Sequence, residues 1–179
     1  MTKARRIKYS FLAVCALIFL VILGVILSGP SKGVKVAASD LKELSTMIRS
    51  HYQNRPGYWG LNTDVVLINK IAPLKMLKDA KLISGTGRVM IGSGANGEII
   101  MPGEKTFDVT FKDLNFKDCV DLVSFKFKEE HYLGLMNIKI VNDKGETLFD
   151  WGGENNIPAE KATAKEACSD KNDVVWSYE

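Results

Sequence analysis

The stretch FLAVCALIFLVILGVIL, residues 11–27, decides how this chain is organised. Its residues are apolar without interruption, and as an α-helix with a rise of about 1.5 Å per residue they span about 25 Å. With residues 9, 10, 28 and 29 the helix reaches about 31 Å, close to the hydrocarbon thickness of a bilayer. The sequence therefore predicts a transmembrane helix over residues 9–29 and a folded domain over residues 34–179.

The residues before this helix set its expected orientation. Lys3, Arg5, Arg6 and Lys8 are basic, and residues 1–8 contain no acid, which favours a cytoplasmic flank and an exported C-terminal domain. The apolar run is longer than the roughly 7–15 residues of a signal peptide, and the small-residue pattern at 36–38 lies too far beyond it for cleavage. We expect an uncleaved anchor with a domain on the far side of the membrane. A removed signal peptide is the alternative.

The charge of the exported domain limits what it can bind. The chain has 24 lysines and arginines against 21 acids, and four of the basic residues precede the apolar run. The exported domain is therefore close to neutral. Because nucleic-acid binding relies on a basic face, nucleic acid is not an expected partner.

The helical signal is strongest over residues 34–52, where apolar side chains recur on one face. The turn-forming residues 54–57 end this helix. Two shorter helices are expected next, one with Thr63 as its N-cap and one that begins at Pro73. Because the helix at 34–52 follows the transmembrane segment so closely, the two could form one long helix with a transmembrane half and an amphipathic half.

Alternating apolar and polar residues predict strands farther along the chain. The clearest run is 107–112, which has the period of a half-buried strand. The other expected elements are strands at 88–91, 98–101, 136–140, 147–149 and 174–176, and short helices at 116–123, with Asn115 as its cap, and at 158–168. This mixture of helices and strands indicates an α+β domain.

Two of the three cysteines fall in the exported domain. Cys15 lies within the apolar run, whereas Cys119 and Cys168 lie beyond it. Two cysteines on the oxidising side of a membrane predict one disulfide. A metal site is not expected, because these cysteines have no nearby histidine, and the only histidines are His51 and His131.

No motif in the chain indicates catalysis or a cofactor. Gly92, Gly94 and Gly97 spell G-x-G-x-x-G, but the residues that follow are typical of a strand and turn, so a hairpin loop is expected instead of a dinucleotide site. Ser39 and Lys42 form an S-x-x-K pair without the partner motifs of penicillin-binding proteins. His51 is expected to pack at the end of its helix.

The three tryptophans have two interpretations. Trp59, Trp151 and Trp176 could line a sugar-binding surface. Packing in the core or in an interface is the expectation for all three, because aromatic side chains bury large apolar areas.

The order of these parts resembles the type IV pilins, and in particular the type IVb pilins. The likeness begins with the apolar and then amphipathic N-terminal helix. It continues in residues 48–76, which are similar to the helix end and αβ-loop of those pilins, and in 107–122, similar to their strand and cysteine-bearing helix. Residues 167–176 are similar to the C-terminal cysteine and closing strand.

The resemblance implies a long N-terminal helix packed on a small antiparallel sheet, with a disulfide between Cys119 and Cys168. It also implies a non-enzymatic structural subunit of a type IVb-like pilus, major or minor, without a cofactor. Such a subunit assembles through its apolar helix with copies of itself or with other pilus subunits. The expected location is then the inner membrane, or the extracellular pilus after assembly.

One departure from the family keeps a second interpretation open. Prepilins carry a glycine at the leader cleavage site and a glutamate as the fifth residue of the mature chain. Residues near Ile7 and Lys8 offer neither, and Asp40 is the first acid in the chain. The alternative is a single-pass inner-membrane protein whose pilin-like periplasmic domain binds other envelope components and does not polymerise.

Overall fold

The computed structural model describes residues 29–92, 105–128, 132 and 134–179. The chain divides into two units, residues 1–30 and 31–179, and the second contains all the helices and strands of the described part. Except for Gly29, the predicted transmembrane helix lies outside the described residues, as do the predicted strand 98–101 and His131. None of the helices in the described part is both long enough and apolar enough to cross a membrane.

The amphipathic helix predicted at 34–52 is confirmed as α2, Lys32–Tyr52. Ser31 is its N-cap, and the Ser31 hydroxyl accepts a hydrogen bond from the Val34 N–H at 3.1 Å. The face toward the core carries a stripe of buried apolar residues: Val34, Ala37, Ala38, Leu41, Leu44, Ile48 and Tyr52. Burying each large aliphatic side chain contributes roughly 1.5–3 kcal/mol, so packing, more than intrinsic helix propensity, holds α2 in place.

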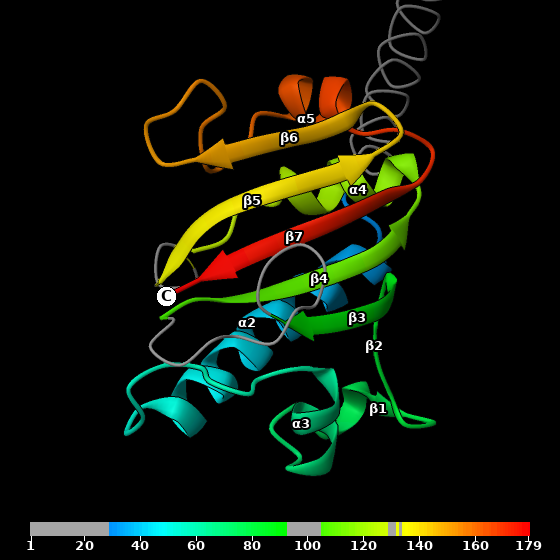
Figure 1. Ribbon diagram of the computed structural model, residues 1–179. Helices are drawn as coiled ribbons and strands as arrows, with labels where there is room; N and C mark the ends of the chain where they lie inside the picture. Colours follow the sequence, from blue (N-terminus) through cyan, green and yellow to red (C-terminus); the bar gives the residue numbers. More distant parts are fainter. Residues whose placement is uncertain (1–28, 93–104, 129–131, 133) are drawn as a thin grey trace, which may run out of the picture. The chain divides into compact units, whose positions relative to one another are not determined.

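A seven-stranded antiparallel sheet lies against this helix, and α2, α4 and α5 all cover the same face of it (Figure 1). The strand order is β1-β2-β3-β4-β7-β5-β6. The strands are β1 Leu77–Lys78, β2 Lys81–Ser84, β3 Gly87–Gly92, β4 Phe107–Leu114, β5 Leu135–Asn142, β6 Gly145–Asp150 and β7 Asn172–Tyr178. The expected α+β fold, with a long helix on an antiparallel sheet, is confirmed.

The last strand in the sequence lies near the middle of the sheet. β7 pairs with β4 on one side and with β5 on the other, so that Trp176 lies opposite both Val109 and Ile138. Trp176 is 1 % exposed and is among the largest buried side chains. The core is therefore complete only when the C-terminal strand has been inserted.

A buried acid interrupts the apolar face of α2. Asp40 is 2 % exposed, and its carboxylate lies 3.0 Å from Lys75 Nζ and accepts a hydrogen bond of 2.7 Å from the Ser84 hydroxyl. Lys75 also lies 2.9 Å from Glu43. The hydrogen bonds from Lys75 to Glu43 and Asp40 raise the pKa of the lysine, so Lys75 stays protonated throughout the neutral range. These contacts fix α2 to the loop before β1 and to β2.

The short helix after α2 begins one residue earlier than expected. In α3, Thr63–Ile68, the N-cap is Asn62, whose side chain accepts a hydrogen bond from the Val65 N–H at 2.9 Å. Thr63 is not the cap because its hydroxyl accepts from the Ile91 N–H at 2.8 Å and donates to the Ile91 carbonyl at 3.2 Å. Thr63 therefore supplies hydrogen-bond partners for the backbone N–H and carbonyl of Ile91 in β3.

The prediction of a helix that begins at Pro73 is wrong. Pro73 is followed by a single 3₁₀ turn, Leu74–Met76, and the chain then enters the β1–β2 hairpin. Asp79 and Ala80, at the tip, have φ values of 47° and 56°. Two positive φ values in succession give a tight hairpin turn that matches the twist of the sheet, whereas an α-helix requires negative φ values throughout.

The remaining described elements agree with the predictions from the sequence, apart from two differences. The helices are α4, Phe116–Val123, in which the Asn115 side chain accepts from the Asp118 N–H at 2.9 Å, and α5, Lys161–Ala167. α5 begins three residues after Pro158, where the helix was expected to start. In β4, which was predicted to be half-buried, Asp108 and Thr110 are also buried.

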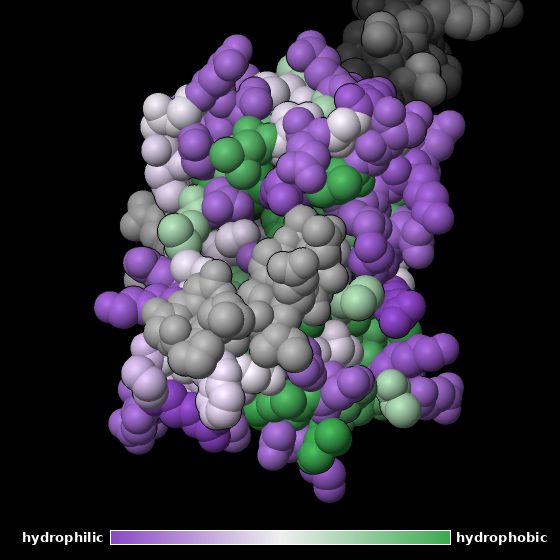
Figure 2. Space-filling model, in the orientation of Figure 1, coloured by the Kyte–Doolittle hydropathy of each residue, from purple (hydrophilic) through white to green (hydrophobic). Residues whose placement is uncertain are grey.

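Several large apolar side chains remain at the surface. Ile68 and Leu74 are both 78 % exposed, and Leu148 on β6 is 48 % exposed. Figure 2 shows hydrophobic areas separated by a mainly hydrophilic surface, one over the segment that holds α3 and β1 and another over β5 and β6. Ile68 and Leu74 thus lie toward the β1 edge of the sheet, and Leu148 lies on the β6 edge.

A row of aromatic rings joins the end of α2 to the sheet. The ring centroids of Tyr52 and Tyr58 are 5.5 Å apart, those of Tyr58 and Phe107 4.6 Å, and those of Phe107 and Tyr178 5.4 Å. Burial raises the pKa of Tyr52, Tyr58 and Tyr178, most strongly for Tyr178. The folded domain therefore holds these phenols in the neutral form.

This arrangement predicts alkaline destabilisation that depends on Tyr178. An unfolded tyrosine ionises near pH 10, whereas folded Tyr178 keeps its proton. The contribution of Tyr178 to the unfolding free energy is therefore complete below about pH 10 and is lost as the pH rises further. Tyr178→Phe should reduce the slope of unfolding free energy against pH, above pH 10, by up to about 1.4 kcal/mol per pH unit. Urea unfolding of the detergent-solubilised chain between pH 8 and 11 measures this slope. An unchanged slope would contradict the assignment.

Candidate assembly region around the disulfide

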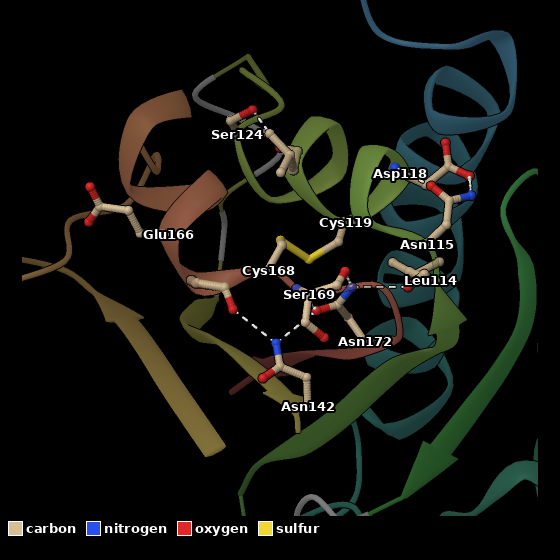
Figure 3. Close-up of a disulfide and its surroundings, with 12 residues drawn as sticks. Leu114, Asn115, Asp118, Cys119, Ser124, Asn142, Glu166, Cys168, Ser169 and Asn172 are labelled. Carbon is tan, nitrogen blue, oxygen red and sulfur yellow. Dashed lines mark hydrogen bonds between the residues drawn. A yellow bond between two sulfur atoms is a disulfide. The ribbon is translucent and has the colours of Figure 1, made fainter. Parts of the chain in front are cut away.

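Cys119 and Cys168 form a disulfide in the structure. Cys119 lies in α4 and Cys168 ends α5; their Cα atoms are 6.1 Å apart, and 49 positions separate them in sequence. Both side chains are fully buried, and the bond lies between the two helices (Figure 3). The disulfide therefore closes a loop that contains β5 and β6.

A buried asparagine holds the segment after this disulfide. Asn172 is 1 % exposed, and its amide nitrogen donates to the carbonyls of Leu114, at 3.0 Å, and Ser169, at 2.7 Å. Its amide oxygen accepts from the Asn142 side chain at 2.8 Å and from the Ser169 N–H at 2.7 Å. All the hydrogen-bonding capacity of this amide is satisfied, and its contacts come from β4, β5 and the turn before β7 (Figure 3).

The end of α5 accepts three further hydrogen bonds from the end of β5 and the turn after it. Lys144 Nζ donates to the carbonyl of Glu166 at 3.0 Å and to that of Cys168 at 2.6 Å, while Asn142 donates to the carbonyl of Ala167 at 2.9 Å. A cation at a helix C-terminus satisfies carbonyls that lack a partner within the helix and opposes the helix dipole. The β5–β6 hairpin is thus fixed to the disulfide-bonded helix.

A second buried acid joins α4 to α5. Asp121 is 4 % exposed, and its carboxylate is paired with Lys117, one turn before it on α4, and with Lys161, 3.3 Å away on α5. At the start of α4, Asp118 accepts a hydrogen bond of 3.2 Å from Ser31, the N-cap of α2. The disulfide region is therefore connected through α4 to the first turn of the long helix.

Among the residues that the structure describes, the weak sequence motifs do not come together as a catalytic or metal site. Ser39 and Lys42 lie on the exposed face of α2. His51 is exposed, which corrects the expectation that it packs; its Nε2 lies 3.5 Å from Arg55 Nη2. Within the described ranges there is no group of three side chains able to hold a metal ion. Gly92 closes β3, while the other two glycines of the motif lie outside the described residues.

Core packing is confirmed for Trp176, and packing in an interface stays a prediction for the other two tryptophans. Trp59 is 63 % exposed and Trp151 is 50 % exposed. The Trp151 indole is nevertheless fixed, since its Nε1 donates to the Leu135 carbonyl at 2.7 Å and its ring meets that of Tyr132 edge-on at 5.5 Å. Ile68, Leu74 and Leu148 are also exposed, and the sequence did not single out these three residues, because hydrophobicity alone predicts burial.

Comparison with solved structures defines the class of this fold. The chain is similar to the type IVb pilin from Salmonella typhi, with 17% sequence identity and a TM-score of 0.52 over 79% of this chain and 97% of that chain. It is also similar to TcpA, a type IV pilin from the El Tor biotype of Vibrio cholerae, with 15% identity and a TM-score of 0.51 over 83% of this chain and 100% of that chain. The fold is that of a type IV pilin.

A match to a family model identifies the family of this chain. The model of the Bundlin family matches residues 30–179, and the chain belongs to this family. No curated protein sequence matches the chain. The family and the fold together confirm the predicted likeness to type IVb pilins, and the chain is a structural subunit of a pilus.

Breaking the disulfide should destabilise the domain markedly. For a sequence separation of 49 residues, the chain-entropy treatment gives a stabilisation of about 4 kcal/mol. The Cys119→Ala/Cys168→Ala variant should lose about that much unfolding free energy in urea, as should the wild-type chain in reductant, whereas Cys15→Ala should behave like wild type. An unchanged wild-type midpoint in reductant would contradict a stabilising disulfide.

Replacing the buried asparagine should have a comparable effect. Asn172→Asp removes both donated hydrogen bonds and places a carboxylate against the carbonyls of Leu114 and Ser169, which should cost about 3 kcal/mol of unfolding free energy. Asn54→Asp, in the exposed turn after α2, should change it by less than about 0.5 kcal/mol. Urea unfolding of both variants checks this difference, and equal effects would show that the hydrogen-bond network is dispensable.

Proposed function

We propose that this pilus subunit is held in the inner membrane by residues 9–29 before assembly, with residues 1–8 in the cytoplasm and residues 34–179 exported. In this proposal the apolar helix then leaves the lipid and packs against the same helix of neighbouring subunits. The observation that carries the proposal is the continuity of the sequence, in which an apolar run of bilayer length ends just before the match to the Bundlin family begins at residue 30.

The physical basis is an exchange of lipid contacts for helix contacts. Lipid tails are as apolar as leucine, so the gain comes from close packing of helices, and small residues allow backbones to approach. The apolar run contains Ala13, Ala16 and Gly24. The disulfide-bonded domain of residues 34–179, which we call the head, suits the oxidising side of the membrane. The assembly step requires neither a cofactor nor a catalytic residue.

One observation favours a second candidate function, that of a membrane-anchored adaptor which does not polymerise. The resemblance implies that a glutamate near the mature N-terminus neutralises the terminal amine of a neighbouring subunit. The first acid of this chain is Asp40, which is buried within the head and paired with Lys75. Asp40 cannot serve a neighbouring N-terminus without losing these contacts.

A substitution that alters helix packing but not hydrophobicity separates the two functions. Gly24→Leu should leave the amount of protein in the membrane unchanged and lower its amount in sheared filaments roughly tenfold, because the larger side chain blocks close helix approach. Leu23→Ile, which conserves volume, should assemble like wild type. Immunoblots of the sheared and membrane fractions measure both quantities.

Mass spectrometry of the mature N-terminus complements these fractions. A trimmed N-terminus on protein from the sheared filaments supports assembly after processing. Wild-type protein found only in the membrane, with Lys3–Lys8 still attached, would contradict the filament subunit and favour the adaptor.

A further inference from the structure

A cationic cavity lies at the C-terminal end of α2. It has a volume of about 400 Å³, and none of its lining residues is acidic: Arg49, Tyr52, Gln53, Arg55, Pro56, Gly57, Tyr58 and Lys105. Arg49 and the C-terminal residue Glu179 both lie against Gly134, so the C-terminal acid is on the Arg49 side of the cavity. Arg55 and Lys105 are the two other cations that line the cavity.

The Arg55 side chain is already oriented. Its guanidinium lies over the ring of Tyr52, 4.7 Å from the centroid, and 3.5 Å from His51 Nε2. Stacking on an aromatic ring limits the rotamers of an arginine and keeps its planar set of donors ready for a carboxylate. In the part of the chain that the structure describes, no carboxylate forms an ion pair with Arg55 or Lys105.

An acidic cavity lies where β4 ends and β7 begins. Its volume is about 590 Å³, and its charged lining residues are Lys112, Asp113, Asp143, Asp170, Lys171 and Asp173. Two of the four acids are neutralised within the cavity, because Asp173 pairs with Lys112 and Asp113 lies 2.9 Å from Lys171. Asp143 and Asp170 are exposed and have no ion pair among the described residues.

The two cavities lie at opposite ends of the same strand. Phe107 begins β4, and its ring contacts Tyr58 of the cationic cavity, whereas Leu114 ends β4 and pairs with Asn172 of the acidic cavity. An extended strand of this length covers roughly 25 Å. The charges are too far apart to meet within one copy, but a second copy displaced along the strand direction can bring them together.

Resting on the proposed function as a filament subunit, we propose that the cationic cavity of one copy receives the Asp143 and Asp170 carboxylates of the next copy. The contact joins two different surfaces of the same chain and therefore propagates instead of closing into a dimer. Charge complementarity of this kind sets the direction and register of the copies more than it adds affinity. The contact thus gives neighbouring heads a defined order.

A charge exchange in the full-length chain tests this contact. Arg55→Glu and Asp170→Lys should each lower the amount of sheared filament roughly tenfold, since each places like charges together, while membrane levels stay constant. The double variant Arg55→Glu/Asp170→Lys restores opposite charges and should recover filaments to within about twofold of wild type. The matched controls are Lys78→Glu on β1 and Glu154→Lys after β6, which line neither cavity and should assemble normally.

Cysteine cross-linking identifies the contact directly. In a Cys15→Ser background, the pair Arg55→Cys/Asp170→Cys should give a ladder of multimers under non-reducing conditions, and either cysteine alone should give only monomer. The pair Lys78→Cys/Glu154→Cys should give no ladder. If the wild-type chain forms filaments but the double variant does not recover them and no ladder appears, the proposed contact is wrong and the pilus function stands. If the wild-type chain forms no filaments, both proposals are wrong.

Discussion

The contact between the buried stripe of α2 and one face of the sheet is the interaction on which the rest of the structure depends. Leu41, Leu44 and Ile48 are fully or almost fully buried there. Polar contacts fix the helix along its length, through Ser31 to Asp118 at the start and through Asp40 to Lys75 in the middle. Because each contact reaches a different segment, α2 positions both the loop before β1 and the disulfide region. The head is thereby organised around the helix that follows the apolar run.

The sheet is completed only by the last residues of the chain. β7 lies between β4 and β5, so the two halves of the sheet meet only through the strand that comes last in the sequence of this domain. Pairings between residues far apart in sequence carry a large loop-closure entropy. The disulfide lies just before this strand, and the Asn172 hydrogen bonds lie at its first residue. Both reduce the conformations available to β7. Their placement explains why a domain of this size combines a covalent bond with a fully satisfied buried amide.

The parts of the fold that could be predicted from the sequence are those with local signals. The periodicity of α2, the Asn115 cap of α4 and the turn between β5 and β6 are each contained in a few neighbouring residues. The hairpin at Asp79 and Ala80 was missed because its tip has no glycine to reveal the positive φ values. Asn62 and Thr63 are both capable caps, and only the position of β3 shows why Thr63 contacts Ile91 instead.

In the region around the disulfide, the pairing of the cysteines could be predicted from the sequence, but the hydrogen bonds that surround it could not. The number and location of Cys119 and Cys168 indicate a disulfide, whereas the partners of Asn172 come from segments as far as Leu114, 58 positions earlier. The two cavities combine charges from several strands and loops, which no local pattern reveals. The exposure of Trp59 and Trp151 was likewise not predictable, because a large aromatic residue suits a core and an interface equally well.

The most direct test of the account is a helical reconstruction of sheared filaments by electron cryo-microscopy. The account predicts a filament built from this chain, with residues 9–29 packed against one another at the axis and the α2-backed sheets arranged outside them. Filaments that lack the chain, or that contain its head without the apolar helix, would contradict the claim that this helix carries assembly.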